Sequence, residues 1–155
     1  MTDTAKGSLA RQRWLAVLAH AERVALERHA ALLAEYSFEW LRAPEIGLAM
    51  VRSRIAGEGD RFNLGEATVT RCAVRHRPAR GEATAGVGYV LGRDPARCEW
   101  VARFDALLQV GSLHELLQRE VIEPLRAATA FANARQWART ASSSVRFYTL
   151  QSEIA

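Results

Sequence analysis

Arginines are the side chains of this sequence with the clearest capacity for chemistry. Of the 21 basic residues all but Lys6 are arginine, and the chain carries a formal net charge of +4. The planar guanidinium group matches the oxygens of carboxylates and phosphates. We expect six arginines to be candidates for contact with phosphate or with a partner protein: Arg52, Arg54, Arg61, Arg71, Arg75 and Arg93.

A glycine-punctuated loop, residues 57–65, precedes the arginine-bearing stretch that reads as a strand. Its glycines can adopt positive φ, and its Asp and Asn side chains favour tight turns. It is no dinucleotide fingerprint, because Phe62 stands where the third glycine is needed, and no Gly-Lys-Ser/Thr step follows. A phosphate nest of backbone N–H groups and a structural hairpin turn both stay open. Arg61 and Arg93 are the strongest phosphate candidates, because each lies beside glycine-containing backbone.

The cysteines, serines, aspartates and histidines do not form the sequence patterns of catalytic or metal-binding sites. Cys72 and Cys98 are too few for a disulfide scaffold and are not spaced as metal ligands. Residues 142–144 are serines without the strained elbow of a hydrolase. Asp94 reads as a helix cap and Asp105 as a residue on a helix face. The histidines show no ligand spacing, and we expect surface or interface roles for them: His20, His29, His76 and His114. The sequence therefore predicts no catalytic, cofactor-binding or metal-binding residue.

The elements that position these residues follow from hydrophobic periodicity. Residues 1–7 are polar and predicted to be disordered, and helical patterns follow at 9–18 and 22–34. The period then changes to two, which predicts four strands, with a turn between the first two at Pro44 and Gly47 and a hairpin loop at 78–85. The predicted strands are 36–41, 48–55, 66–77 and 86–92.

The C-terminal half reads as helical. Asp94 followed by Pro95 predicts a helix start, and the segment 112–115 is a capping-box pattern that predicts another. Pro124 must kink or end that second helix. The helical pattern continues to about residue 140, and 141–155 is predicted to be an extended tail.

We therefore predict one domain over residues 1–155 with an α+β fold. In it a four-stranded antiparallel meander is covered by the N-terminal and C-terminal helices. Pairing of segments 48–55 and 66–77 would bring four arginines together: Arg52, Arg54, Arg71 and Arg75. Like charges opposed across a ladder cost up to about 1 kcal/mol each. An anion or an acidic partner would relieve that cost, and so would a glutamate of the chain: Glu39, Glu45 or Glu66.

Composition narrows the class of protein further. Hydrophobic residues make up 49% and charged residues 25%, which is typical of globular domains. The first residues show no signal peptide, and no apolar run approaches the roughly 18 residues of a membrane span. We expect a cytoplasmic protein.

Four strings together resemble the PhnG family of the bacterial carbon–phosphorus lyase system, and the likeness covers residues 9–150. They are RQRWLAVLAHA (11–21), RAPEIGLAMVRSRIAGEGDRFNLGEATVTRCAVR (42–75), GYVLGRDPARCEW (88–100) and SSVRFYTL (143–150).

The resemblance implies an accessory subunit of phosphonate catabolism in a two-fold hetero-octamer with PhnH-, PhnI- and PhnJ-like subunits. With a PhnL-like ATPase, that system forms alpha-D-ribose 1-methylphosphonate 5-triphosphate from MgATP and methylphosphonate and releases adenine. The nucleosidase chemistry belongs to the PhnI-like subunit. An iron–sulfur cluster, used with S-adenosylmethionine, belongs to the PhnJ-like subunit. The resemblance supplies no catalytic residue for this chain, and no cofactor is expected in it.

Two other function classes stay open on the residues alone. The first is a basic α+β module that binds nucleic acid, although Tyr36, Phe38 and Trp40 fall on one strand face, which indicates core. The second is a stand-alone enzyme acting on a small molecule, which would need a polar pocket that no motif indicates. We favour the accessory subunit, with no nucleic acid and no membrane among its partners.

Overall fold

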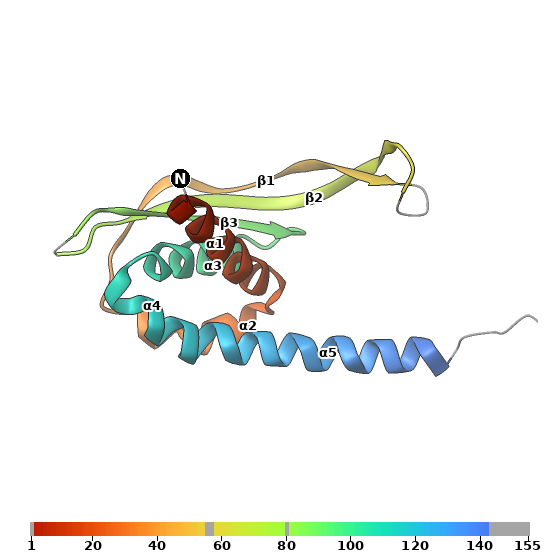
Figure 1. Cartoon of the computed structure of the whole chain (residues 1–155). Helices are drawn as coiled ribbons and strands as arrows, with labels where there is room; N and C mark the ends of the chain where they lie inside the picture. Colours follow the sequence, from red (N-terminus) through yellow and green to blue (C-terminus); the bar gives the residue numbers. More distant parts are fainter. Residues whose placement is uncertain (1, 55–57, 80, 143–155) are drawn as a thin grey trace, which may run out of the picture.

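An antiparallel sheet and the helices that pack on one of its faces form the fold (Figure 1). The computed structural model describes residues 2–54, 58–79 and 81–142. The elements in chain order are α1 (Thr2–His20), α2 (Arg23–Glu27), the 3-10 helix η1 (Ala30–Leu33), β1 (Phe38–Arg54), β2 (Arg61–His76), β3 (Thr84–Leu91), α3 (Pro95–Leu108), α4 (Gly111–Leu117), the π-helix η3 (Gln118–Ile122) and α5 (Glu123–Ser142). The predicted α+β class is confirmed.

The sheet has three strands in the order β1-β2-β3, and both pairs are antiparallel. The prediction of four strands is wrong, because segments 36–41 and 48–55 belong to the single strand β1. Pro44 and Gly47 lie inside this strand instead of forming a turn. β1 is an edge strand, where proline is tolerated because one side of the backbone has no neighbouring strand. Its register shifts on both sides of Arg42, so the predicted turn is an irregular stretch of the edge strand.

The predicted loop 57–65 is shorter than expected, because β2 begins at Arg61. β1 and β2 also continue beyond β3, whose last residue, Leu91, pairs with Val69. Residues 48–54 and 61–68 therefore form a two-stranded ribbon that has no third strand beside it. We call this ribbon the hairpin arm. In Figure 1 it extends past α3, as does the C-terminal half of α5, and both reach toward the same side of the view.

The core lies between the sheet and α3. Alternate β2 residues from Thr70 to His76 are buried on the helix-facing side, and the most buried helix is α3. Glycine permits this close approach, because a Cβ atom at Gly86 would overlap the carbonyl oxygen of Ala102 and lie 2.6 Å from the backbone nitrogen of Ala106. α3 therefore packs directly against the backbone of β3.

Two of the three helix predictions for the C-terminal half are confirmed: the start at Asp94 and Pro95, and the interruption at Pro124. Asp94 caps α3 by accepting a hydrogen bond from the Arg97 backbone N–H (3.0 Å), and Pro95 occupies the first turn, as predicted. The capping-box prediction is wrong, because α4 begins at Gly111 after Val110 with no side-chain cap. The π-turn of η3 ends directly before α5, whose second residue is Pro124. Proline has no N–H to donate to the preceding turn, so the regular helix is interrupted there.

The two ends of the described chain differ from the sequence-based expectation. α1 begins at Thr2, inside the segment 1–7 that we expected to be disordered. α5 runs to Ser142, so residues 141–142 are helical instead of extended. The rest of the predicted tail lies outside the described residues. None of the helices in the described part of the chain is long and apolar enough to cross a membrane.

Candidate partner-binding surfaces

The one fully buried carboxylate among the described residues is Asp105 of α3. Oδ2 accepts hydrogen bonds from Arg11 Nη2 (2.6 Å) and the Val87 backbone N–H (2.9 Å). Oδ1 accepts from Arg11 Nε (3.2 Å) and Trp14 Nε1 (2.9 Å). Four donors from α1 and β3 thus satisfy both oxygens. Asp105 joins three elements, and a role as a catalytic acid or base would require breaking these bonds.

Sequence reasoning placed Asp105 on a helix face and missed this network. The signal that could have found it is the position of Asp105 inside the most apolar run of α3, between Phe104 and Ala106. An aspartate in such a run needs buried donors. Which donors it finds depends on Arg11, which lies 94 residues away in the sequence.

The histidines maintain local structure. Through Nδ1 three of them hydrogen-bond backbone carbonyls: His20 with Ala16 (2.7 Å), His76 with Ser37 (3.0 Å) and His114 with Leu108 (2.7 Å). The expected surface or interface role is wrong for His76, which is 4% exposed and packs against the rings of Tyr36 and Phe38. Within residues 2–54, 58–79 and 81–142, no group of three or more His, Cys, Asp or Glu residues is placed to hold a metal ion.

The predicted cluster of four arginines does not form. The register places Glu45 opposite Arg71 and Glu39 opposite Arg75, and both arginines make ion pairs with these glutamates. Glutamates of the chain itself therefore neutralise Arg71 and Arg75, which is one of the alternatives that the sequence left open. Arg52 and Arg54 lie further along β1, opposite Asn63 and Arg61. The expectation that Arg52 and Arg54 would lie near Arg71 and Arg75 is wrong, because the ladder aligns different parts of the two strands.

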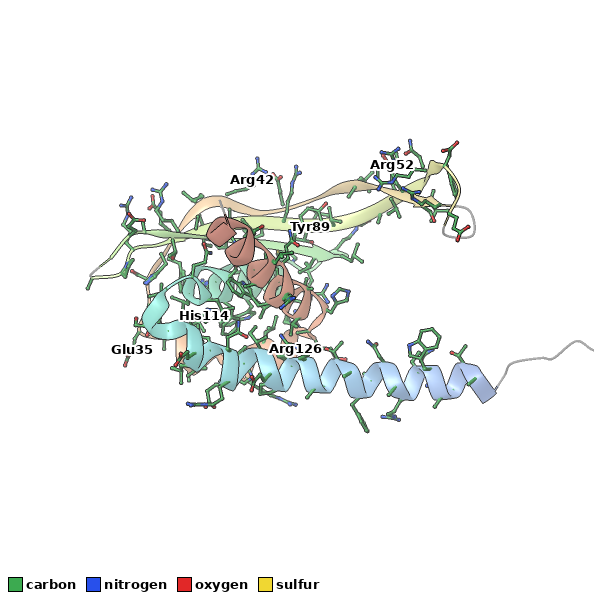
Figure 2. The ribbon with its side chains drawn as sticks, in the orientation of Figure 1. Glu35, Arg42, Arg52, Tyr89, His114 and Arg126 are labelled. Atoms are coloured by element: carbon green, nitrogen blue, oxygen red, sulfur yellow. The ribbon has the colours of Figure 1, made fainter. Side chains whose placement is uncertain are left out.

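The remaining candidate arginines cluster in a different place. Arg52, Arg54 and Arg61 lie at the turn end of the hairpin arm, where Figure 2 labels Arg52. All three are exposed, and none forms an ion pair with another described residue. Arg93 is also exposed and follows Gly92, which has φ of 92°. The turn end of the hairpin arm thus carries three arginines close in sequence to the carboxylates of Glu58 and Asp60, and the structure does not bring Arg93 into it.

An apolar stripe follows the helix-facing side of β1. The stripe consists of Trp40, Ile46, Leu48 and Met50. These residues pair in the ladder with the helix-facing residues of β2, or with β2 residues that continue the same face along the hairpin arm. All four are exposed, and Leu48 is 64% exposed. They are uncovered because α3 packs mainly on β2 and β3. Exposed apolar side chains in a row on an edge strand are typical of a surface that binds another protein.

Of the three aromatic residues that began the first predicted strand, only Trp40 is exposed. Tyr36 and Phe38 are half-buried against the core. They do not form the exposed stacking platform that single-stranded nucleic acid requires.

The C-terminal half of α5 also exposes large apolar side chains. Every residue from 130 to 141 is exposed, including Phe131 (68%) and Trp137 (75%). We call residues 130–141 the helix arm. Isolated helices shorter than about 12–15 residues are marginal in water, and most helical stability in proteins comes from packing of an apolar face. Because its side chains are exposed, tertiary packing contributes little to the stability of the helix arm.

The outer face of the sheet carries ion pairs on β1 and β2, such as Arg71 with Glu45, and apolar side chains on β3. Val87, Tyr89 and Leu91 of β3 alternate on this face, and all three are exposed. Tyr89, labelled in Figure 2, lies opposite Arg71 of β2. A solvated face of an antiparallel sheet is normally polar, so this face is a third candidate for contact with a partner.

A hollow beside the helix arm lies between the α1–α2 junction and α5. Its volume is about 460 Å³, and its lining includes His20, Val24, Arg28, Thr129 and Asn133. Most of its lining surface is apolar. It is continuous with the start of the helix arm, because Ala132 and Asn133 line it as well.

Comparison with known proteins identifies one family. The sequence profile described as "Phosphonate metabolism protein PhnG" matches residues 9–152. A protein of Rhizobium meliloti (strain 1021), named alpha-D-ribose 1-methylphosphonate 5-triphosphate synthase subunit PhnG, is 40% identical to the chain. The alignment covers 77% of this chain and 81% of the relative.

Proposed function

This chain belongs to the PhnG family of phosphonate metabolism proteins, and on that basis we propose that it is an accessory subunit of alpha-D-ribose 1-methylphosphonate 5-triphosphate synthase. The relative that bears this name as a subunit is 40% identical over most of both chains. In this role the chain supports the formation of alpha-D-ribose 1-methylphosphonate 5-triphosphate from MgATP and methylphosphonate, with release of adenine. It contributes binding surface, and its partners contribute the chemistry.

The observation that carries the proposal is the pair of arms with uncovered apolar side chains. Leu48 and Met50 on the hairpin arm, and Phe131 and Trp137 on the helix arm, are all more than half exposed. Burying one large apolar side chain stabilises by about 1.5–3 kcal/mol relative to leaving it in water. A chain that works alone would lose that stabilisation several times over. A subunit recovers it when a partner covers the arms.

The proposed partners are PhnI-like and PhnJ-like subunits on the arms, within a two-fold hetero-octamer that also contains a PhnH-like subunit. A PhnL-like ATPase joins at the synthase step. We assign MgATP to the assembly as substrate. We assign the iron–sulfur cluster and S-adenosylmethionine to the PhnJ-like subunit, and no cofactor to this chain. Because the substrate is MgATP, we place the assembly in the cytoplasm.

Three arginines against the two carboxylates of Glu58 and Asp60 leave the tip of the hairpin arm with a small net positive charge, which favours an acidic partner surface. Arg52, Arg54 and Arg61 gather there without ion pairs among the described residues, whereas Arg71 and Arg75 already have glutamate partners. Carboxylates on a partner would pair with the tip arginines and relieve their mutual repulsion. Arg61 and Arg93 also keep the role of phosphate contacts that we proposed from the sequence.

Co-purification tests the accessory role directly. A tagged chain expressed with PhnH-, PhnI- and PhnJ-like subunits should retain all three on an affinity column. Replacing Leu48 and Met50 by serine, or Phe131 and Trp137 by serine, should release at least one partner. Leu9→Ser is the matched control, because Leu9 is 55% exposed on α1, outside both arms. Retention of every partner by both double variants would contradict the proposal.

Turnover tests the phosphate contacts separately. Adenine release from ATP and methylphosphonate is measured with the reconstituted complex carrying Arg61→Ala and Arg93→Ala. A loss of turnover with intact assembly would support contact with substrate. Unchanged assembly and unchanged turnover would remove both arginines from the site.

A further inference from the structure

Two thiols that the proposed function does not use lie against each other in the core. Cys72 of β2 and Cys98 of α3 have their Sγ atoms 3.3 Å apart, and both are buried, with exposures of 3% and 0%. The Cys98 thiol donates to Cys72 Sγ. The Cys72 thiol in turn donates to the carbonyl oxygen of Cys98 (3.3 Å), and Cys98 Sγ also lies 3.4 Å from the carbonyl oxygen of Thr70. These are the two cysteines of the chain, and the fold has brought them together from positions 26 residues apart.

A glycine makes room for this thiol pair. Gly88 of β3 lies directly opposite Cys72 in the ladder. A Cβ atom at Gly88 would lie 2.9 Å from Cys98 Sγ and 3.0 Å from Cys72 Sγ, and would overlap the carbonyl oxygen of Cys98. Any larger residue would push the two thiols and α3 away from the sheet. The backbone of β3 therefore fixes the close approach of the two sulfur atoms.

The thiols differ in acidity because of the bond between them. The hydrogen bond donated by Cys98 lowers the pKa of Cys72, against the opposing effect of burial. The same bond, together with burial, raises the pKa of Cys98. A thiolate is the reactive form of cysteine. Cys72 is thus the more acidic thiol of the pair, and Cys98 Sγ lies 3.3 Å from it.

We propose that Cys72 and Cys98 are a redox modification site, at which a hydroperoxide installs a reversible disulfide between β2 and α3. In the first step the Cys72 thiolate attacks the terminal oxygen of the hydroperoxide. The O–O bond breaks, Cys72 becomes a sulfenic acid, and the released alkoxide takes up the proton that Cys72 lost on ionising and leaves as an alcohol, or as water from hydrogen peroxide. In the second step Cys98 sulfur attacks Cys72 sulfur, the S–O bond breaks, and the hydroxyl leaves as water with the Cys98 proton. The two thiols together lose two electrons, and the peroxide gains them.

A peroxide must first reach Cys72, which is 3% exposed, and the two sulfur atoms must then approach each other. A disulfide has an S–S length of about 2.05 Å, so the sulfur atoms need to close from their separation of 3.3 Å. The product joins the strand that carries the hairpin arm to the helix that covers it. A dithiol such as dithiothreitol reverses the bond by thiol–disulfide exchange.

The test treats the full chain, bound to its partner subunits, with hydrogen peroxide. Free thiols are then trapped with N-ethylmaleimide under denaturing conditions, and the intact mass is measured. We expect most molecules to lose two hydrogen atoms and take up no maleimide. Dithiothreitol should restore two reactive thiols. In Cys98→Ser, dimedone should trap a sulfenic acid at Cys72, and in Cys72→Ser, Cys98 should remain reduced.

Three results would overturn the proposal. One is a native chain that keeps both thiols reactive toward maleimide after peroxide treatment. Another is oxidation of each thiol to a sulfinic acid with no bond between them. The third is formation of the disulfide only after unfolding in guanidinium chloride. Peroxide treatment of the wild-type chain is enough to support or overturn the disulfide, so the test remains valid even if a serine variant does not fold.

Discussion

Truncation of Trp137 separates folding from assembly most cleanly. Its side chain is 75% exposed near the end of the helix arm, so the isolated chain gains little from it. Surface substitutions of this kind change the free energy of unfolding by less than about 0.5 kcal/mol. Alanine also has a higher helix propensity than tryptophan, which offsets part of any loss. We expect Trp137→Ala to leave the unfolding midpoint of the isolated chain unchanged.

Association should respond differently. Tryptophan is enriched among interface residues whose truncation costs about 2–4 kcal/mol of binding free energy. At about 1.4 kcal/mol per factor of ten, this range corresponds to a Kd increase of roughly 30-fold to 700-fold. The expected signature is therefore a large loss of affinity without a loss of stability.

Two measurements on the same samples check this. Thermal unfolding followed by circular dichroism gives the stability of the isolated chain, and isothermal titration calorimetry gives its Kd for the partner subunits. Leu9→Ala is the control, because Leu9 is 55% exposed on α1 and belongs to neither arm. The reasoning is refuted if Trp137→Ala and Leu9→Ala bind the partners equally well, or if Trp137→Ala unfolds the isolated chain.

Three further variants test other parts of the structure. Asp105→Ala should lower the free energy of unfolding by about 2–6 kcal/mol in a urea titration, because it leaves the Trp14 indole N–H and the Val87 backbone N–H without their acceptor and the half-buried Arg11 without its carboxylate; a loss below about 1 kcal/mol would contradict the network. Gly86→Ala should destabilise by at least about 1–3 kcal/mol, because its Cβ would overlap the α3 backbone, whereas Gly47→Ala, with open space around it, should be neutral; equal midpoints for the two would count against this packing. Arg54→Glu with Arg61→Glu should slow association with the partners and reverse its salt dependence, because salt then screens a repulsion; surface plasmon resonance at several ionic strengths measures both. An unchanged association rate would contradict an acidic partner surface.

Local signals in the sequence predicted the features that local physics determines. Asp94 and Pro95 define the start of α3 whatever the rest of the chain does, because the cap and the missing N–H act within one turn. Period-two alternation predicted β3 in the same way. The interruption before Pro124 also follows from one residue, since proline removes a donor wherever it stands in a helix.

Features that depend on residues far apart in the sequence could not be predicted from the sequence. Pro44 predicts a turn unless the strand is known to lie at an edge, and only the assembled sheet shows that it does. The pairing of Arg71 with Glu45 depends on a register that shifts on both sides of Arg42. The same limit applies to Asp105, whose arginine partner comes from α1. Exposure of the two arms is likewise a property of the complete fold, because the same apolar residues read as core when their coverage is unknown.

Amide hydrogen exchange, compared between the free chain and its complex with the partner subunits, tests the central claim most directly. Exchange reports local opening, which is fastest where tertiary contacts are few. The account predicts fast exchange in residues 130–141 of the free chain. In the complex it predicts strong new protection in that helix arm and in the hairpin arm, residues 48–54 and 61–68, with little change in α3. Protection that appears elsewhere and leaves both arms exchanging as fast as in the free chain would contradict it.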